Sequence, residues 1–354
     1  MKEAHIDNVL VVRTDRIGDV ILSLPMISTL HASYPHARIS MLLRSYTKEL
    51  AEGQKGLQEI LLYDANGVRK PFVQMLSELR SRRFDTVVIS YPTFRLAALT
   101  FFAGIPTRVG TGYRWYSFFF NRKVFEHRRT ADRHEAQYNL SLLKALGCVV
   151  EENPKPSLTI SGRERETASA VRRKRDLSET ALTVVLHPGS GGSAREWSAE
   201  NFGSLALSLH AEGMQVVVTG ASSELPLVSR VIERSRGKAV PVVGELSLKE
   251  LAAFLESTDL FVSNSTGPLH IAAAVGTPVI GLYPPIRACS PQRWGPLTEK
   301  KVVFVADKEC CVRCKGKQCR GNECMDQITV EQVVRAAKAL LRQLGVDKEV
   351  GIRS

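Results

Sequence analysis

Short apolar runs alternate with segments of helical periodicity along almost the whole chain, and this alternation restricts the fold more than any other feature. In the first half, Val9–Arg13, Arg38–Leu43 and Thr86–Ser90 are expected to be buried strands, whereas Asp19–Ala32 and Pro71–Arg82 carry apolar residues at helical spacing. Strands that alternate with helices form parallel sheets whose two faces are covered by those helices. The sequence therefore predicts an α/β fold.

The second half repeats the pattern, with expected strands at Thr183–Leu186, Gln215–Thr219, Val240–Val243, Leu260–Ser263 and Pro278–Leu282. A chain of 354 residues suits two α/β domains, each of roughly 150 residues. We expect two Rossmann-like domains with parallel sheets facing a central cleft. The predicted divisions are an N-terminal domain at 1–160, a linker at 161–180, a C-terminal domain at 181–327 and a C-terminal helix at 328–354 that packs back on the N-terminal domain.

Loops after the strands of such sheets hold ligands, and the first one carries the segment RTDRIGDVILSLP, Arg13 to Pro25. Asp19 stands where a helix is expected to start, so its carboxylate would face the positive end of the helix dipole. An aspartate fixed there can accept a proton from an attacking hydroxyl. The alternative is that Asp19 only caps the helix. A single glycine, Gly18, replaces the dinucleotide fingerprint G-x-G-x-x-G, which disfavours a dehydrogenase.

Two loops of the second half are suited to binding anions. HPGSGGSAREW, from His187 to Trp197, has small residues that let the backbone approach phosphate oxygens, and Arg195 can pair with a diphosphate. SNSTGPLH, from Ser263 to His270, runs from a strand into a helix N-terminus, a second natural anion site. The first loop could instead be an ordinary flexible strand-to-helix loop, and the second a capped helix start with no ligand. A lone histidine such as His270 is more often structural. No D-x-D metal handle occurs in the chain.

The net charge of +12 suggests an anionic partner, although a solvated basic surface would also account for it. Basic residues concentrate between Arg95 and Arg133, interleaved with aromatic residues. This stretch has no zinc-finger spacing, RRM signature or basic-region heptads, so nucleic acid is not the expected partner. The most apolar window, Leu96–Ile105, is far shorter than the roughly 20 residues of a membrane span. With no signal-type apolar stretch at the N-terminus, a cytoplasmic protein is expected.

Five cysteines lie in a short C-terminal segment, 310–324, with the spacing CC-x2-C-x4-C-x4-C. Cys310, Cys314, Cys319 and Cys324 could form a four-thiolate zinc or iron–sulfur site. The spacing matches no zinc motif, so reduced cysteines packed in a loop remain the alternative. A structural metal is therefore possible but is not required by the sequence.

In their order and separation, these motifs resemble the ADP-heptose:lipopolysaccharide heptosyltransferases, glycosyltransferase family nine. The resemblance extends over nearly the whole chain and rests on RTDRIGDVILSLP, HPGSGGSAREW, SNSTGPLHIAAAVGTPVIGLYPP and the cysteine-rich segment. It implies a GT-B fold and an inverting, metal-independent transfer of heptose from an ADP-sugar to the inner core of lipopolysaccharide. The acceptor would be Kdo-lipid A or heptosylated core, at the cytoplasmic face of the inner membrane.

The resemblance also implies roles for individual residues. Asp19 would be the general base, and Arg195 would bind the diphosphate. The other donor-binding candidates are Ser190, Gly191, Glu224, Ser265, Thr266, Gly267, Pro268 and His270. The acceptor-binding candidates in the N-terminal domain are Arg16, Arg95, Arg114, Arg122 and Lys123. Aromatic residues of the same stretch could rest on the membrane surface.

Ser265 departs from the resemblance, because the family commonly has aspartate at this position. Serine can hydrogen-bond a sugar hydroxyl but makes no charge-assisted bond, which leaves the transferred sugar open. The alternatives are a GT-B transferase that uses another nucleotide sugar or glycan acceptor, and a nucleotide-binding protein without catalysis.

Overall fold

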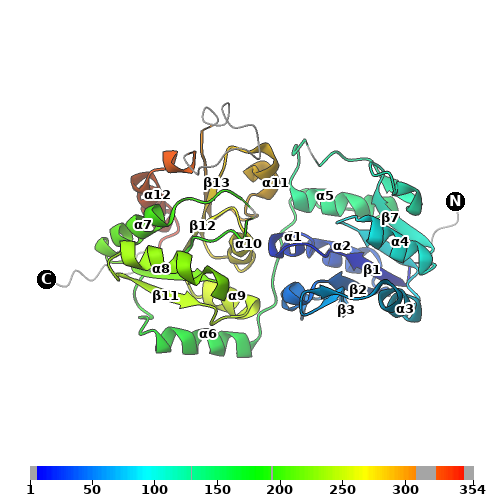
Figure 1. Cartoon of the computed structure of the whole chain (residues 1–354), viewed down its shortest axis with the longest axis horizontal. Helices are drawn as coiled ribbons and strands as arrows, with labels where there is room; N and C mark the ends of the chain where they lie inside the picture. Colours follow the sequence, from blue (N-terminus) through cyan, green and yellow to red (C-terminus); the bar gives the residue numbers. More distant parts are fainter. Residues whose placement is uncertain (1–5, 129, 193, 308–323, 347–354) are drawn as a thin grey trace. The chain divides into compact units, whose positions relative to one another are not determined.

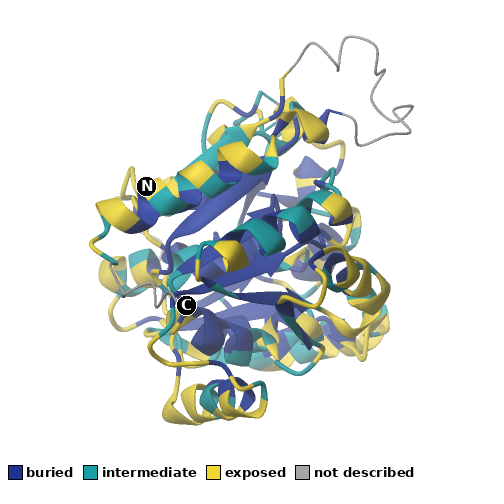
Figure 2. Ribbon diagram, turned by 90° about the vertical axis from the view of Figure 1, so that its left-hand side faces the viewer, coloured by how far each residue is buried: buried dark blue, intermediate teal, exposed yellow. Residues whose placement is uncertain are grey.

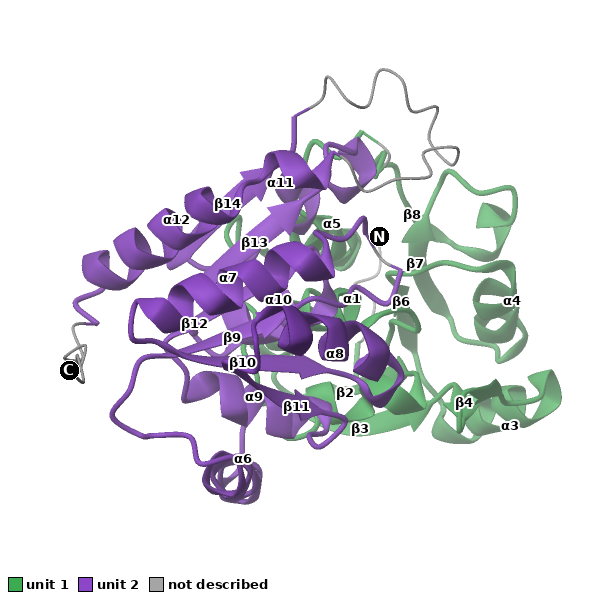
Figure 3. Ribbon diagram, turned by 60° about the vertical axis from the view of Figure 1, so that its left-hand side comes forward, with its two compact units in different colours: residues 1–159 green, residues 160–354 purple. Residues whose placement is uncertain are grey.

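The structure of the chain is a computed structural model that describes residues 6–128, 130–192, 194–307 and 324–346. It divides into two compact units, Met1–Thr159 and Ile160–Ser354, each with its own sheet (Figure 3). The division falls within one residue of the predicted end of the N-terminal domain. The predicted linker at 161–180 is largely a helix of the second unit, α6 (Gly162–Lys174), which packs against α9 (Leu248–Glu256).

The first unit contains a parallel sheet (Figure 1). Its strands, in spatial order, are β3 (Leu57–Leu62), β2 (Arg38–Leu43), β1 (Asn8–Val12), β6 (Thr86–Ile89), β7 (Thr107–Thr111) and β8 (Arg122–Val124). Its helices are α1 (Ile17–Ile21), α2 (Pro25–Ser33), α3 (Phe72–Arg82), α4 (Phe94–Phe102) and α5 (Glu135–Ser141), with short 3-10 turns η1 (Ser45–Ala51), η2 (Ser117–Phe119) and η3 (Leu142–Leu146). A small antiparallel pair, β4 (Asp64–Ala65) and β5 (Val68–Arg69), stands apart from this sheet.

The second unit repeats the same order of strands. Its sheet runs β11 (Ala239–Val243), β10 (Gln215–Gly220), β9 (Thr183–His187), β12 (Leu260–Asn264), β13 (Val279–Tyr283) and β14 (Lys301–Val305), all parallel. The remaining helices are α7 (Ala199–Ala211), α8 (Leu225–Arg234), α10 (Gly267–Ala274), α11 (Pro291–Trp294) and α12 (Val330–Gln343), with 3-10 turns η4 (Ser222–Glu224), η5 (Arg287–Cys289) and η8 (Met325–Gln327). The predicted α/β fold with two Rossmann-like parallel sheets is therefore confirmed.

Successive strand residues point to opposite faces, so each sheet supports two layers of core. In the second unit, Val184 and Leu186 of β9 belong to a core shared with α7, α8 and α12. Val185, between them, is fully buried on the other face. Figure 2 shows the strands as the most deeply buried layer, beneath helices whose outer surfaces are exposed. Burial on both faces explains why these strands are continuous apolar runs in the sequence.

Two expectations are corrected by these elements. The helix expected over Asp19–Ala32 is broken, because α1 ends at Ile21 and a new helix, α2, begins at Pro25. Proline lacks an N–H and suits a first helical turn, so it starts a helix here rather than continuing one. The C-terminal helix α12 was expected to pack on the N-terminal domain. Its apolar side chains instead lie in the core of the second unit, where α12 contacts α7, β13 and β14.

Candidate functional site

A buried arginine lies among carboxylates at the carboxyl end of β1. Arg13 is 1 % exposed. Its Nε lies 2.7 Å from Oδ1 of Asp15, and its Nη1 lies 3.3 Å from Oε1 of Glu135. The same guanidinium pairs with Oδ1 of Asp19. One cation thus joins the loop after β1 to α5, which follows much later in the chain.

Asp19 lies in the first turn of α1, as the sequence predicted, but it is not the N-cap of that helix. The N-cap is Arg16, whose side chain makes no capping hydrogen bond. The alternative that Asp19 serves only as a helix cap is therefore wrong. Its carboxylate instead pairs with Arg13, which holds it in one orientation near the helix N-terminus.

The charges of this cluster shift the ionisation of its members. Burial lowers the pKa of Arg13, but the carboxylates of Asp15, Asp19 and Glu135 outweigh burial and raise that pKa overall. Burial raises the pKa of Asp15 to about 7, against the opposite influence of Arg13. Asp15 therefore exchanges a proton near neutral pH. It lies in the same cluster as Asp19, the general base predicted from the sequence.

Helix α5 completes the cluster and was not anticipated. Asn139 accepts a hydrogen bond from Nη1 of Arg13 at 3.0 Å and donates to the carbonyl of Leu22 at 3.1 Å. Glu135, which is 1 % exposed, also pairs with Arg128. The sequence gives no local signal for these contacts, because 122 residues separate Arg13 from Glu135. A charged residue at the end of a buried strand was the one available clue.

The predicted acceptor-binding residues are spread over several elements of the first unit. Arg16 is exposed at the start of α1, and Arg114 is exposed before η2. Arg122 and Lys123 belong to β8. Arg95 of α4 is held within the unit, because it donates to the carbonyl of Lys70 and lies over the ring of Tyr63, 5.1 Å from its centroid.

In the second unit the predicted donor loops follow neighbouring strands, since β9 lies between β10 and β12. Asn264, at the end of β12, joins the two ends of the β9 loop. Its Nδ2 donates to the carbonyl of Pro188 at 2.7 Å, and its Oδ1 accepts from the N–H of Trp197 at 2.8 Å. Asn264 is fully buried. The β9 loop is therefore joined to the end of β12, just before the start of α10, at the position where ligands bind in open α/β sheets.

The β9 loop is folded around Ser190. Oε1 of Glu196 accepts hydrogen bonds from the backbone N–H of Ser190 at 2.8 Å and from its hydroxyl at 2.7 Å. Gly191 and Gly192 have φ angles of +54° and +72°, a left-handed backbone that glycine adopts readily. The glycines are exposed at the tip of the loop, and Arg195 is partly exposed beside Glu196.

Glu224 reaches the β9 loop from the end of η4. A Cβ atom on Gly189 would lie 1.9 Å from Oε1 of Glu224, so only glycine leaves room for this carboxylate. Oε2 of Glu224 accepts the N–H of Ala221 at 2.9 Å and lies 3.8 Å from Nε2 of His187. Burial lowers the pKa of His187, although Glu224 and Glu196 act in the opposite direction. His187 is therefore neutral at pH 7, and its Nδ1 lies 3.0 Å from the hydroxyl of Thr219.

The N-terminus of α10 forms the other wall of this site. Thr266 is the N-cap, its side chain makes no capping hydrogen bond, and Pro268 occupies the first turn. Ser265 is buried and hydrogen-bonds the hydroxyl of Tyr283, which turns it toward the core. His270 is also buried. The helix begins at Gly267, where backbone N–H groups remain without intrahelical partners and suit an anion.

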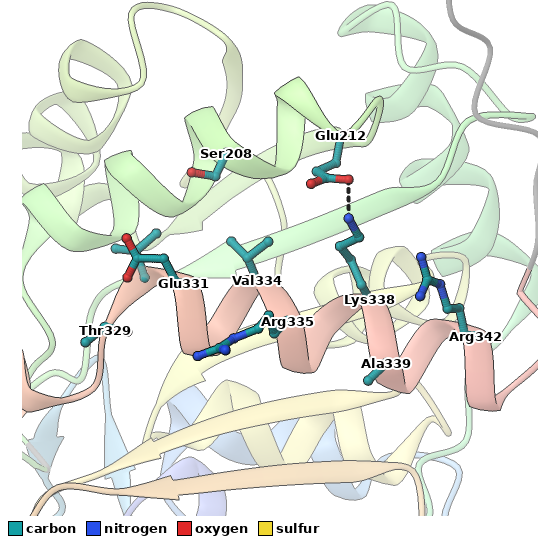
Figure 4. A pocket seen from close by; sticks show the side chains of 10 residues that line it. Ser208, Glu212, Thr329, Glu331, Val334, Arg335, Lys338, Ala339 and Arg342 are labelled. Atoms are coloured by element: carbon teal, nitrogen blue, oxygen red, sulfur yellow. Dashed lines mark hydrogen bonds and ion pairs between the residues drawn. The ribbon is translucent and has the colours of Figure 1, made fainter.

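Other features lie away from these loops. A groove of about 920 Å³ runs between α7 and α12, lined by residues such as Glu212, Arg335 and Lys338, and it includes none of the predicted site residues (Figure 4). Cys324 is buried. Cys310, Cys314 and Cys319 lie outside the described residues, so the structure does not test the proposed metal site. Within the described ranges, no helix is long and apolar enough to cross a membrane.

The chain has two Rossmann-like units, and the second has two loops suited to an anion after its central strands β9 and β12. This is the class of fold in which nucleotides are commonly bound. Residues 72–325 match glycosyltransferase family 9 (heptosyltransferase). The chain belongs to this family and is a glycosyltransferase, as the sequence motifs indicated.

Relatives support the same assignment. Lipopolysaccharide heptosyltransferase 3 of Escherichia coli is 28% identical over 337 residues, which cover 92% of this chain and 96% of the relative. The crystal structure of a family 9 glycosyltransferase from Veillonella parvula superposes with a TM-score of 0.83 at 23% identity, covering 96% and 99% of the two chains. The structure of E. coli ADP-heptose lipopolysaccharide heptosyltransferase II gives a TM-score of 0.78 at 23% identity, with the same coverage. The predicted GT-B fold class is thereby confirmed.

Proposed function

We propose that this glycosyltransferase moves a heptose from ADP-heptose to the inner core of lipopolysaccharide, with Kdo-lipid A or heptosylated core as acceptor. The observation that carries the proposal is the junction made by Asn264, which joins the β9 loop to the end of β12, just before α10. The β9 loop and the loop after β12 both follow central strands of one sheet, and the backbone N–H groups of such loops suit a diphosphate. The names of the relatives supply ADP-heptose as the donor and lipopolysaccharide as the class of acceptor.

The donor would be bound by the second unit. Arg195 and the N-terminus of α10 would meet the diphosphate, with Ser190, Gly191 and Thr266 beside it. Glu224 is placed beside the β9 loop, where a carboxylate can accept hydrogen bonds from ribose hydroxyls. Since arginine and helix N-termini can balance a diphosphate, the transfer would require no metal ion.

The acceptor would be activated by the first unit. Asp19 takes the proton from the acceptor hydroxyl while that oxygen bonds to the anomeric carbon. The bond from this carbon to the ADP oxygen breaks, and ADP leaves from the opposite face, so the carbon is inverted. Arg13 orients the carboxylate through their ion pair. A lipid-linked acceptor would bring the enzyme to the cytoplasmic face of the inner membrane.

The assignment of Asp19 as general base is tested by measuring turnover. The assay follows ADP release from ADP-heptose with Kdo-lipid A or heptosylated core as acceptor. We expect Asp19→Asn to reduce turnover on the order of 10²–10⁴-fold, the usual contribution of a general base, while ADP binding stays intact. The control is Asp15→Asn, which mimics the protonated carboxyl of Asp15 below pH 7. We expect the control to lose less than about tenfold. Asp19 is not the general base if Asp19→Asn keeps near-normal turnover, or if Asp15→Asn loses more turnover than Asp19→Asn does.

A second candidate, transfer of another nucleotide sugar, is favoured by Ser265. This residue stands where the family commonly has aspartate, and its hydroxyl is engaged by Tyr283. Calorimetric titration with ADP and UDP separates the two candidate donors. If the chain binds UDP more tightly than ADP, the donor is a UDP-sugar and not ADP-heptose. Tight ADP binding without turnover would keep the nucleotide site and direct the search to other ADP-sugars.

A further inference from the structure

A group of exposed aromatic rings covers one surface of the first unit, on α4 and the segment around η2. Phe94 is 48 % exposed, Phe101 43 %, Phe102 51 %, Trp115 74 % and Phe118 62 %. We call these five residues the aromatic patch. Single exposed apolar residues are ordinary on a protein surface, whereas contiguous ones mark a binding surface.

The aromatic patch is contiguous because four of its rings share one buried neighbour and the fifth stacks on one of those four. The ring of Phe119, 7 % exposed, lies 4.4 Å from that of Phe118, 5.1 Å from that of Phe101 and 5.9 Å from that of Phe94, centroid to centroid. Phe102 lies 6.3 Å from the same ring. Trp115 stacks on Phe94 at 5.0 Å. The ring of Phe119 and the stacking of Trp115 on Phe94 therefore hold the exposed rings together at the surface.

Along the chain, the segment that carries the aromatic patch has charges of one sign. Residues 94–125 contain five basic residues and no acidic residue. Arg114, Arg122 and Lys123 form no side-chain hydrogen bond or ion pair with any residue that the structure describes. Arg108 holds its guanidinium over the ring of Phe101, 5.2 Å from the centroid. The next acidic residue along the chain, Glu126, is already paired with Arg133.

We propose that the aromatic patch and its basic rim dock the enzyme on an anionic lipid bilayer, with the rings at the headgroup level and the cations on lipid phosphates. Aromatic rings favour the interface between membrane and water, and basic side chains are attracted to anionic lipids. A second copy of this chain fits less well, because a symmetric contact would set the basic rim against itself. The inference adds a binding surface to the proposed function, which supplies the lipid-linked acceptor.

The test is flotation of the full chain with vesicles of phosphatidylcholine alone, or of phosphatidylcholine and phosphatidylglycerol in equal parts. Neither vesicle contains donor or acceptor, so the result is independent of the proposed transfer reaction. We expect salt-sensitive binding to the anionic vesicles. Trp115→Ser with Phe118→Ser should weaken it on the order of tenfold or more, through lost apolar contact. Val149→Ser, which alters an apolar residue that is 91 % exposed elsewhere in this unit, is the matched control and should bind normally.

Arg114→Gln with Lys123→Gln should remove the preference for anionic vesicles, about fivefold for each charge lost. A second readout needs no destabilising substitution: brominated lipid should quench tryptophan fluorescence in the wild type, and Trp115→Phe should abolish that quenching. The proposal fails if the wild type ignores anionic vesicles at low salt, or if the aromatic double variant binds as tightly as the wild type. It also fails if sedimentation shows that the wild type is a dimer, that the aromatic double variant is a monomer, and that this variant still binds the vesicles. The aromatic patch would then be a dimer contact.

Discussion

At the scale of single residues, Arg13 is the centre of the polar cluster in the first unit. This guanidinium contacts Asp15, Asp19 and Glu135, although it is almost fully buried. A buried charge is tolerated only when it is paired and hydrogen-bonded, and three carboxylates with Asn139 meet that requirement. The arrangement leaves Asp15 to adjust its own protonation, while Arg13 orients the neighbouring Asp19.

We expect Arg13→Met to lower the free energy of unfolding by about 3–5 kcal/mol, because it leaves buried carboxylates without their cation. Urea unfolding followed by circular dichroism measures the change. Arg163→Met, on the exposed side of α6, is the control and should shift stability by about 0.5 kcal/mol or less. Equal stability of the two variants would mean that the ion pairs of Arg13 contribute nothing to folding.

Asp15 should make stability depend on pH. Burial raises its pKa in the folded chain to about 7, above its ordinary value of 3.8, so the folded state binds the proton more tightly than the unfolded state. Between those values the free energy of unfolding therefore falls as pH rises, by about 1.4 kcal/mol per pH unit at most. Urea unfolding at about pH 5 and about pH 7 should show this fall in the wild type and a weaker one in Asp15→Asn.

The exposed Asp176→Asn is the control for this titration and should keep the wild-type slope. If Asp15→Asn also keeps that slope, Asp15 does not titrate in this window.

Single residues also show which parts of the candidate site could not be predicted from the sequence. Asp19 and Arg195 stand in recognisable local motifs, whereas Glu135 and Asn139 reach Arg13 only through the fold.

At the scale of elements, the order of strands and helices was predictable because burial on both sheet faces leaves continuous apolar runs. Helix α9 (Leu248–Glu256) begins one residue after Ser247, which forms a capping box with Glu250. The helix expected over Asp19–Ala32 was wrong, because apolar spacing continued across a break that only Pro25 marks. The packing of α12 was also wrong, since an amphipathic pattern says that a face is buried but not against which element.

Gly189 gives a prediction at this scale, because it lets the β9 loop approach η4. In Gly189→Ala the new methyl group would displace the carboxylate of Glu224, which lies 1.9 Å from an ideal Cβ. A displaced side-chain end costs little stability, so the expected loss is in ADP affinity, roughly tenfold or more for a hydrogen bond to a charged group. Calorimetric titration with ADP measures it.

Two further variants make this test specific. Glu224→Ala should lose a similar amount of ADP affinity, and the double variant should lose no more than either single variant, as expected for residues that share one interaction. Gly162→Ala is the control, because its Cβ would meet no atom within 4 Å. Additive losses in the double variant would separate the role of Gly189 from that of Glu224.

At the scale of the whole molecule, two units with the same strand order have different polar chemistry. In the first unit, a cluster of carboxylates around an arginine lies at the carboxyl end of β1. In the second unit, β9 is followed by a glycine-rich loop near a helix N-terminus. The shared order follows from the same alternation of strands and helices in both halves. The difference follows from the loops, whose motifs are visible in the sequence, whereas most of the contacts that support these loops are not.

This division predicts where the nucleotide acts. Hydrogen exchange of the full chain, with and without ADP at about a hundred times its dissociation constant, should show protection in the second unit. The affected amides should lie in the β9 loop, in Ser222–Glu224 and at the start of α10, because ordered phosphate contacts close the local openings that permit exchange. Peptides of the first unit that span Arg13–Asp19 serve as the internal control and should exchange as before. Protection confined to the first unit would reverse the assignment of donor and acceptor, and the turnover of Asp19→Asn would then have to be explained by lost donor binding.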